Sequence, residues 1–281
     1  MPLRLALSWA CISHRDYPME SRLSRSPLKA KPLRLPGQSV QDAIENLLWN
    51  ETSPYISIAL AMTIVASFEW VAVLRHLPRQ PWAYSGIAVL AIAFTTMKIW
   101  RVRTRLGQLR LGRDGERAVG QYLERLRTHE ADVFHDVPGD GFNIDHVVLS
   151  VHGFYAVETK TRSKPTRGDA RITLTEEGLA VNGLAPDRDP LVQAQAGARW
   201  LSQLLEETTG RRFPVRGVVL FPGWFVEPMS SAWRMNPEKP WVLEPKAFPG
   251  FIGNEPKQFT DTDLKLAAYH LSRYVRTAND A

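Results

Sequence analysis

Residues 143–160, N-I-D-H-V-V-L-S-V-H-G-F-Y-A-V-E-T-K, predict a β-hairpin. Two apolar, β-branched runs, residues 144–151 and 154–161, flank a turn signal at His152-Gly153. This hairpin is unusual because ionisable residues stand at the outer ends of both runs, where a plain strand pair does not need them.

The ionisable residues of the hairpin are expected to share one face of the sheet. With a two-residue turn at positions 152–153, Asp145 pairs with Lys160 and Val147 pairs with Glu158. Directly paired residues lie on the same face, and side chains two positions apart on a strand do so too. We therefore predict that Asp145, Glu158 and Lys160 lie together near one end of the sheet.

A fourth ionisable residue is predicted on the preceding helix. Residues 113–128 have helical spacing, and Glu116 lies on the same stripe as Val119 and Leu123. An uncompensated charge on an apolar stripe is costly to bury. Glu116 is therefore expected to meet a compensating partner.

Three carboxylates and a lysine in a partly buried place favour a cation. Hard oxygen ligands such as Asp145, Glu158 and Glu116 suit Mg²⁺ or Mn²⁺. Such a metal would activate a water, while Lys160 would stabilise charge developing on a phosphate. The alternatives are an exposed ion pair on the strand, a strand-capping Asp145, and a Glu116 held by the helix dipole.

Four segments resemble the nuclease-related domain (NERD) family, which is placed in the PD-(D/E)xK nuclease superfamily. They are G-R-D-G-E at 112–116, N-I-D-H-V-V at 143–148, G-F-Y-A-V-E-T-K at 153–160 and D-P-L-V-Q at 189–193. The similarity covers roughly residues 112–221. It departs from the family at Asp189, where asparagine is usual, but either residue serves as a helix cap.

The resemblance implies a restriction-endonuclease-like core of a helix, a three-stranded region, a helix and a further strand. It assigns Asp145 and Glu158 to metal binding, Lys160 to catalysis, and Glu116 and Gln193 to supporting roles. The residue patterns beyond the hairpin also predict a mixed α/β fold. The expected elements are a second hairpin at 171–175 and 179–182, helices at 189–209 and 260–275, and strands at 215–221 and 241–243.

Two apolar runs precede this domain and predict a transmembrane helical hairpin. Residues 55–75 and 82–100 are each about long enough to cross a bilayer, with tryptophan or tyrosine near their ends. Lys98 is expected to reach the interface, and Glu69 to face the partner helix or lie near a boundary. The alternative is a pair of buried helices in a soluble protein.

Basic residues gather on one side of both runs. Of the formal charge of +6, about +3 lies in residues 1–50 and about +4 in residues 101–110, whereas residues 111–281 carry about −2. This bias predicts that both termini and the C-terminal domain are cytoplasmic. The single cysteine, Cys11, excludes an internal disulfide and a cysteine-based zinc cluster.

These patterns predict three parts of the chain. Residues 1–50 form a basic, largely flexible arm with a short amphipathic helix near 40–49, residues 51–103 form the membrane hairpin, and residues 108–281 form the NERD-like domain with a C-terminal helical extension. Of the weaker features, His146 is expected to be structural and Trp224, Trp233 and Trp241 to serve packing. A phosphate-contacting role and a plain charged loop stay open for Arg162, Lys164, Arg167 and Arg171.

The predicted function is a membrane-anchored, Mg²⁺- or Mn²⁺-dependent nuclease that hydrolyses DNA phosphodiester bonds in the cytoplasm. Its partners are then nucleic acid and the lipid bilayer. One alternative is a non-catalytic module that binds nucleic acid or a protein at the membrane. Another is an assembly factor whose ionisable cluster is only structural.

Overall fold

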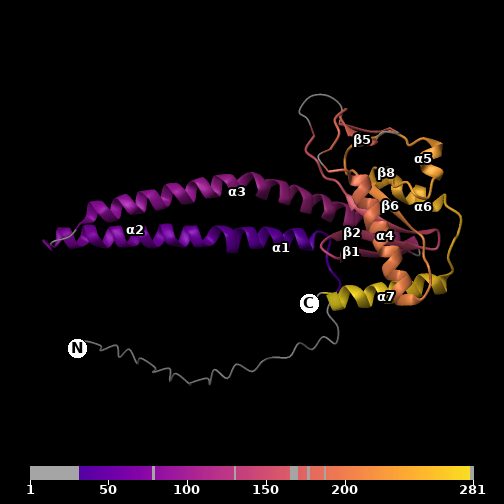
Figure 1. The fold of residues 1–281 in the computed structure, drawn as a ribbon, viewed down its shortest axis with the longest axis horizontal. Coiled ribbons are helices and arrows are strands. Elements are labelled where there is room, and N and C mark those ends of the chain that lie inside the picture. The colour runs from indigo at the N-terminus through magenta and orange to yellow at the C-terminus, as the bar shows by residue number, and fades with distance from the viewer. Residues whose placement is uncertain are drawn as a thin grey trace, which may run out of the picture. The chain divides into compact units, whose positions relative to one another are not determined.

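A computed structural model describes residues 32–77, 80–129, 131–164, 170–175, 178–186 and 188–278. Most of the predicted N-terminal arm, residues 1–31, lies outside this range, as does Arg167. The chain begins with the helices α1 (Gln38–Asn46), α2 (Ser53–Leu74) and α3 (Pro81–Leu123), with a π-helical segment, Leu47–Thr52, between α1 and α2 (Figure 1).

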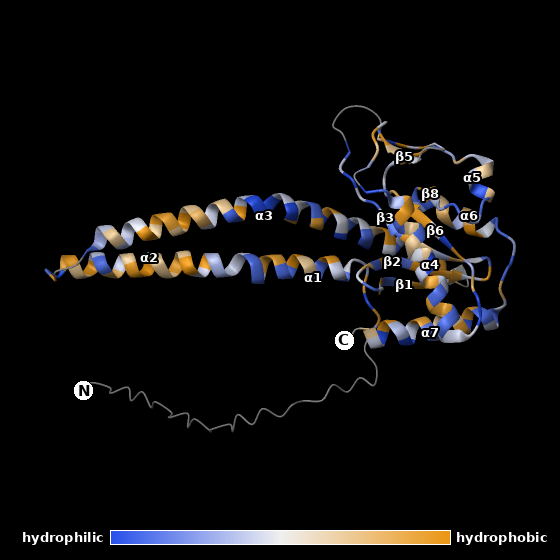
Figure 2. Ribbon diagram, viewed as in Figure 1, coloured by the Kyte–Doolittle hydropathy of each residue, from blue (hydrophilic) through white to orange (hydrophobic). Residues whose placement is uncertain are grey.

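Helices α2 and α3 pack against each other, and much of α2 and the first part of α3 are hydrophobic (Figure 2). Many of their apolar side chains are exposed. Trp70 Nε1 donates to Ser85 Oγ at 2.9 Å, and Thr95 Oγ1 donates to the Tyr55 carbonyl at 3.1 Å. Phe68 is 71% exposed and Leu90 is 72% exposed, which does not suit the buried core helices of a soluble protein. Both helices are long and apolar enough to cross a membrane.

Glu69 and Lys98, the charged residues within the two apolar helical runs, occupy different surroundings. Lys98 Nζ lies 5.2 Å from the ring centroid of Tyr55 at the start of α2. Glu69 is half-buried and lies about one and a half turns before α2 ends.

Helix α3 is one continuous helix rather than a membrane run followed by a separate helix. Residues 101–112 contain no proline and are rich in arginine and leucine, which favour helix, so nothing interrupts the backbone. Its last part approaches the end of β3 (Gly153–Thr159) closely. A Cβ atom added at Gly115 would lie 1.6 Å from Thr161 Oγ1, so only glycine permits this approach.

The main sheet has five strands in the order β1-β2-β3-β6-β8. Strand β2 pairs antiparallel with both β1 and β3, whereas β6 pairs parallel with both β3 and β8. The other strands are β1 (Ala131–Pro138), β2 (Asn143–Ser150), β6 (Val215–Leu220) and β8 (Trp241–Leu243). Strand β1 was not predicted, because its sequence A-D-V-F-H-D-V-P mixes polar and apolar residues without a clear period of two.

The predicted turn of the opening hairpin is wrong by one position, so each residue pairs with a partner two positions earlier than predicted. Ser150 pairs with Gly153, and the turn is Val151-His152. Ser150 Oγ fixes this turn, since it accepts from the His152 backbone N–H and donates to the Gly153 carbonyl. Gly153 is a strand residue whose missing side chain leaves room for the Tyr155 ring, because an added Cβ would lie 2.6 Å from the Tyr155 hydroxyl oxygen.

The error leaves the predicted shared face intact. The observed register ends at His146 opposite Val157, and its continuation sets Asp145 opposite Glu158. Shifting both strands by one position changes the partners but preserves the alternation of faces. Asp145, Glu158 and Lys160 therefore lie on the same side, as the sequence indicated.

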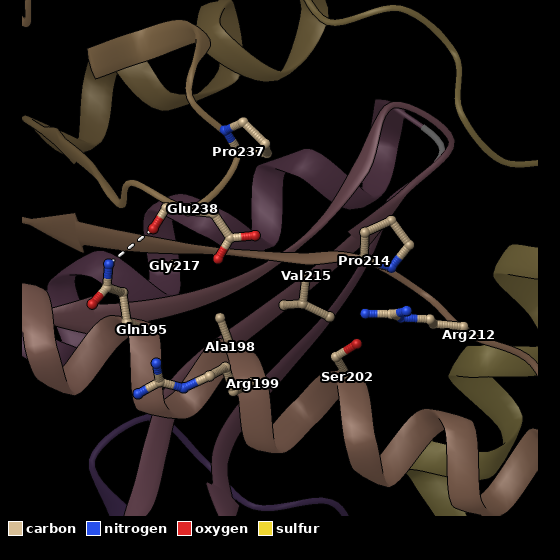
Figure 3. A pocket seen from close by; sticks show the side chains of 10 residues that line it. All are labelled: Gln195, Ala198, Arg199, Ser202, Arg212, Pro214, Val215, Gly217, Pro237 and Glu238. Carbon is tan, nitrogen blue, oxygen red and sulfur yellow. Dashed lines mark hydrogen bonds between the residues drawn. The ribbon is translucent and has the colours of Figure 1, made fainter. Parts of the chain in front are cut away.

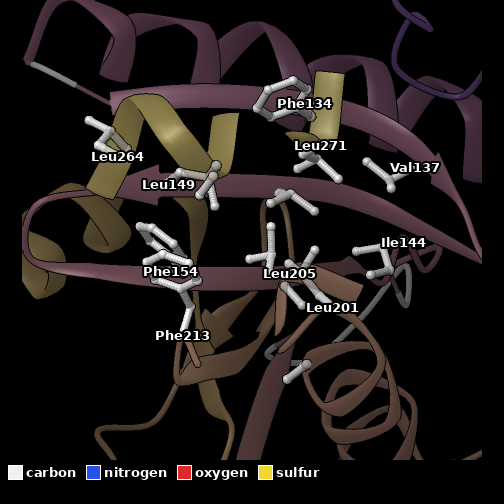
Figure 4. Packing of buried hydrophobic residues seen from close by; sticks show 14 of the residues in the cluster. Phe134, Val137, Ile144, Leu149, Phe154, Leu201, Leu205, Phe213, Leu264 and Leu271 are labelled. Carbon is white, nitrogen blue, oxygen red and sulfur yellow. The ribbon is translucent and has the colours of Figure 1, made fainter. Parts of the chain in front are cut away.

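Helices cover both faces of the sheet. On one face, α4 (Pro190–Thr209) and α7 (Asp261–Ala278) pack against residues such as Leu149 and Phe154 (Figure 4). On the other face, the last turns of α3 and helix α6 (Phe248–Gly253) pack against Val148 and Tyr155. The result is a mixed α/β core with the helix, three strands, helix and strand that the sequence predicted.

The caps of the two covering helices follow their sequence signals. Asp189 Oδ1 accepts from the Leu191 backbone N–H at 2.8 Å, and Gly210 ends α4 with a φ of 71°. Thr260 and Asp263 form the expected capping box before α7.

A smaller sheet, in the order β5-β4-β7, and three short helical segments complete the described part. Strands β4 and β5 form the predicted second hairpin, and Trp224 packs against this sheet. The elements are β4 (Arg171–Thr175), β5 (Gly178–Val181), β7 (Phe225–Val226), α5 (Ser231–Met235) and the 3₁₀ segments Glu124–His129 and Pro245–Ala247.

Helix α1 coincides with the predicted amphipathic helix, but its buried side chains belong to protein packing. Ile44 and the following Leu47 are 3% and 2% exposed, and α1 contacts α3. Trp49, in contrast, is 70% exposed. The apolar face expected on the membrane is thus partly used against α3.

Candidate active site

The candidate site lies where the pairing of β2 with β3 ends. Beyond His146, the Asp145 side chain takes over the role of the backbone: its Oδ2 accepts from the Thr159 N–H at 2.6 Å. The Asp145 carboxyl group is thereby fixed beside the end of β3.

Glu158 and Lys160 flank Thr159 at the end of β3. Lys160 Nζ forms an ion pair with Glu158 Oε1 at 2.6 Å, and both side chains are partly buried. The Lys160 backbone N–H donates to the Leu220 carbonyl at 2.9 Å, which anchors the end of β3 to β6. The E-x-K motif is therefore held at the C-terminal end of β3, the central strand of the sheet. We call this end of the sheet the edge.

Glu116 reaches the same edge from α3. It is 9% exposed, and it is covered by the segment before α1, since a Cβ at Gly37 would lie 3.4 Å from Glu116 Oε2. Gly37 has a φ of 67°, so glycine serves both the turn and the close approach here.

Electrostatics confirm that these carboxyl groups influence one another. Burial, followed by the charges of Asp136 and Glu158, raises the pKa of Glu116 to about 7. Burial, followed by the charges of Glu158 and Glu116, raises the pKa of Asp145 well above its usual range, while the Thr159 N–H and Lys160 oppose this shift. More carboxyl groups meet here than Lys160 offsets, so Glu116 and Asp145 keep their protons to a higher pH than usual.

Sequence reasoning missed a further carboxylate, Asp136. It lies in β1 with a φ of 49°, is 1% exposed, and interrupts the β1–β2 pairing opposite Asp145. Its oxygens accept from the Ser39 N–H and Asn143 Nδ2, and Arg34 Nη1 pairs with Oδ2 at 3.2 Å. No local pattern marks Asp136, because two of its partners, Arg34 and Ser39, lie about 100 residues earlier in the sequence.

Gln193, on the first turns of α4, is brought to the same region. It lines a cavity together with Glu158, and its buried Oε1 has no hydrogen-bond partner in the part of the chain that the structure describes. The five predicted site residues therefore come from α3, β2, α4 and the end of β3.

The histidines are structural in their surroundings. His146 is fully buried, and its Nδ1 lies 2.9 Å from His135 Nδ1, while His135 Nε2 lies 2.7 Å from Glu124 Oε1. Burial, followed by the charge of its neighbour, lowers the pKa of His146 well below its usual range. His152 lies apart from this pair, with Nδ1 at 2.6 Å from the Glu255 carbonyl oxygen.

After the hairpin, Trp224 and Trp241 are packed, whereas the side chains of Arg162 and Lys164 are exposed. Arg171 pairs with Glu227 at 2.7 Å, and Trp224 Nε1 donates to the Arg162 carbonyl at 3.2 Å. Trp241 and Trp224 are 0% and 3% exposed, as expected for packing residues.

The donor chemistry of the edge suits a hard divalent cation in part. Asp145 and Glu158 are carboxylates whose mutual repulsion a cation would relieve. Among the residues that the structure describes, however, no three Asp, Glu, His or Cys side chains are gathered in an arrangement that holds a metal. The two strand carboxylates therefore fit such an ion better than a closed set of three that includes Glu116.

Another cavity, of about 370 Å³, lies between α4 and β6 and is separate from this edge (Figure 3). Gln195 Nε2 donates to the Glu238 carbonyl at 2.8 Å across it, and Arg199 and Arg212 also line it. None of the predicted site residues is among its lining residues, so the two cavities are distinct.

The mixed α/β core is that of the restriction-endonuclease-like class of folds. Residues 111–222 match the family model of the nuclease-related domain, NERD, which confirms the resemblance seen in the sequence motifs. No curated protein and no solved structure matches the chain. The match indicates a nuclease-related function and nucleic acid as the class of partner.

Proposed function

We propose that the chain is a membrane-anchored, divalent-metal-dependent nuclease that hydrolyses DNA phosphodiester bonds. The observation that carries this proposal is the convergence of Asp145, Glu158, Lys160 and Glu116 at one sheet edge inside the matched NERD region. A purely structural ion-pair cluster would not need more buried carboxyl groups than cations, whereas a site that binds a metal cation would.

Each residue has a distinct role in the proposal. Asp145 and Glu158 hold Mg²⁺ or Mn²⁺, Glu116 adds negative charge beside them, and Gln193 supports the site from α4. The bound metal supplies an activated water and a positive charge. Lys160 stabilises the charge that develops on the phosphate.

Metal binding should raise the melting temperature of the full chain in detergent micelles. At a metal concentration 100 times Kd, the stabilisation is about 2.7 kcal/mol, which corresponds to roughly 5–11 °C for a domain of this size. The double variant Asp145→Asn/Glu158→Gln should lose this rise. Tryptophan fluorescence follows the transition, and cleavage of plasmid DNA with Mg²⁺ or with EDTA follows activity.

A matched control replaces two exposed carboxylates, Asp261→Asn and Glu206→Gln, and should keep the full metal effect. An equal rise in melting temperature for the wild type and the Asp145/Glu158 variant would show that the metal binds elsewhere. If metal neither raises the melting temperature of the wild type nor supports DNA cleavage, the proposed function is wrong.

The membrane part of the proposal rests on α2 and α3 and on the charges that flank them. We place both termini and the nuclease domain in the cytoplasm, because Arg101, Arg103, Arg105 and Arg110 follow the second apolar run. A reporter enzyme that is active only in the cytoplasm, fused after Ala281, should be active. Activity from a reporter that needs export would reverse the orientation.

A further inference from the structure

A cavity of about 310 Å³ opens beside the candidate active site, on the α4 side of the sheet. Glu158 belongs both to this cavity and to the ion pair with Lys160. A group bound in the cavity would therefore lie next to the proposed cleavage position. The other lining residues are Phe142, Asn143, Ile144, Ala156, Val157, Gln193, Ala194, Ala196 and Gly197.

Most of the residues that line the cavity are apolar. Helix α4 contributes Ala194, Ala196 and Gly197, while β2 contributes Ile144. A Cβ at Gly197 would lie 3.4 Å from Ile144 Cγ1, so the helix approaches the strand closely at the base of the cavity. Small side chains on one wall and branched side chains on the other suit a flat ligand.

One polar atom in the cavity lacks a partner. Among the residues that the structure describes, Gln193 Oε1 is buried and accepts no hydrogen bond. Buried polar atoms are normally satisfied, and leaving one unpaired is costly. The Asn143 amide, which also lines the cavity, donates from Nδ2 to Asp136 Oδ1 at 3.1 Å rather than to Gln193. A ligand that carries an N–H group would complete the hydrogen bonding of Gln193.

An aromatic ring stands at the mouth of the cavity. Phe142 is 39% exposed, and its ring meets Trp200 edge to face, at 5.6 Å between centroids and 80° between planes. Behind it, a Cβ at Gly139 would lie 2.8 Å from Phe142 Cζ, so only a glycine leaves the ring in this place. The ring is therefore held while part of it stays open for stacking.

We propose that this cavity binds a single unpaired nucleobase of the strand whose phosphate lies at Glu158 and Lys160. The inference rests on the proposed nuclease function and names the substrate class: single-stranded or locally unpaired DNA. A base offers a flat ring for Phe142 and amino or imino N–H groups for Gln193. At about 310 Å³ the cavity is at the lower end of ligand pockets, which suits one heterocycle rather than a base pair.

The test measures DNA binding by the full chain in detergent micelles with EDTA present, so that no strand is cut. Fluorescence anisotropy compares a labelled single strand, the same sequence as a duplex, and a strand of abasic residues. Phe142→Ala should weaken binding of the single strand by about 5- to 150-fold, the usual range for one stacked base. It should leave the duplex and the abasic strand unchanged.

Two further variants separate the cavity from general effects on the fold. Ala196→Phe fills the cavity from an exposed position of α4 and should cause the same selective loss. Tyr269→Ala removes an exposed aromatic ring of α7 outside the cavity and should change nothing.

The outcomes distinguish this inference from the proposed function. If Phe142→Ala and Ala196→Phe bind the single strand as the wild type does, the base pocket is wrong, while metal-dependent plasmid cleavage by the wild type would leave the nuclease proposal standing. If both variants lose single-strand binding but the wild type never cleaves, the pocket stands and the nuclease proposal fails.

Discussion

Lys160→Ala should lower the rate constant of metal-dependent DNA cleavage by about 10²–10³-fold, the usual cost of removing one group that stabilises transition-state charge. The Lys160 ammonium is the charge paired with Glu158, at 2.6 Å, at the sheet edge. Its backbone is fixed to β6, so truncation removes the positive charge without releasing the strand. Single-turnover cleavage of a labelled DNA strand measures the effect.

The substrate affinity should change much less than the rate, because the proposed role of Lys160 belongs to the transition state. Lys265→Ala, an exposed lysine of α7, is the matched control and should cleave as the wild type does. Equal cleavage rates for Lys160→Ala and the wild type would show that Lys160 has no catalytic role. A wild type that binds DNA but never cleaves it would favour the non-catalytic binding module.

Glu116→Gln should stabilise the metal-free protein at pH 8 by roughly 3 kcal/mol and have no effect below pH 4.5. Burial and the charges of Asp136 and Glu158 raise the pKa of Glu116 from 4.5 to about 7. Between these values the unfolded carboxyl group is ionised while the folded one keeps its proton. Wild-type stability therefore falls as the pH rises from about 4.5 to about 7, and the glutamine variant lacks this part of the fall.

Thermal melts in EDTA from pH 4 to pH 8 provide the measurement. At pH 8 the variant should melt about 6–12 °C above the wild type. Glu206→Gln, at an exposed position of α4, is the control and should follow the wild type at every pH. Parallel melting curves for wild type and Glu116→Gln across the whole range would contradict a buried, repelled carboxyl group at position 116.

Local signals in the sequence determined much of the fold. Asp189 and Thr260 begin α4 and α7, and Gly210 ends α4, as the sequence predicted. These caps were predictable because a cap depends on residues within one turn. The alternation of faces along a strand was equally local, so Asp145, Glu158 and Lys160 were grouped correctly despite the wrong turn position.

The tertiary structure alone decided how these residues are surrounded. Asp136 binds Ser39 across 97 positions of sequence, and Gly37 covers Glu116 from the segment before α1. The raised pKa values of Glu116 and Asp145, the unpaired Gln193 oxygen and the cavity beside Phe142 arise from burial and from neighbours that distant segments supply. Sequence periodicity specifies which face a side chain takes, whereas desolvation and long-range contacts set its charge and its partners.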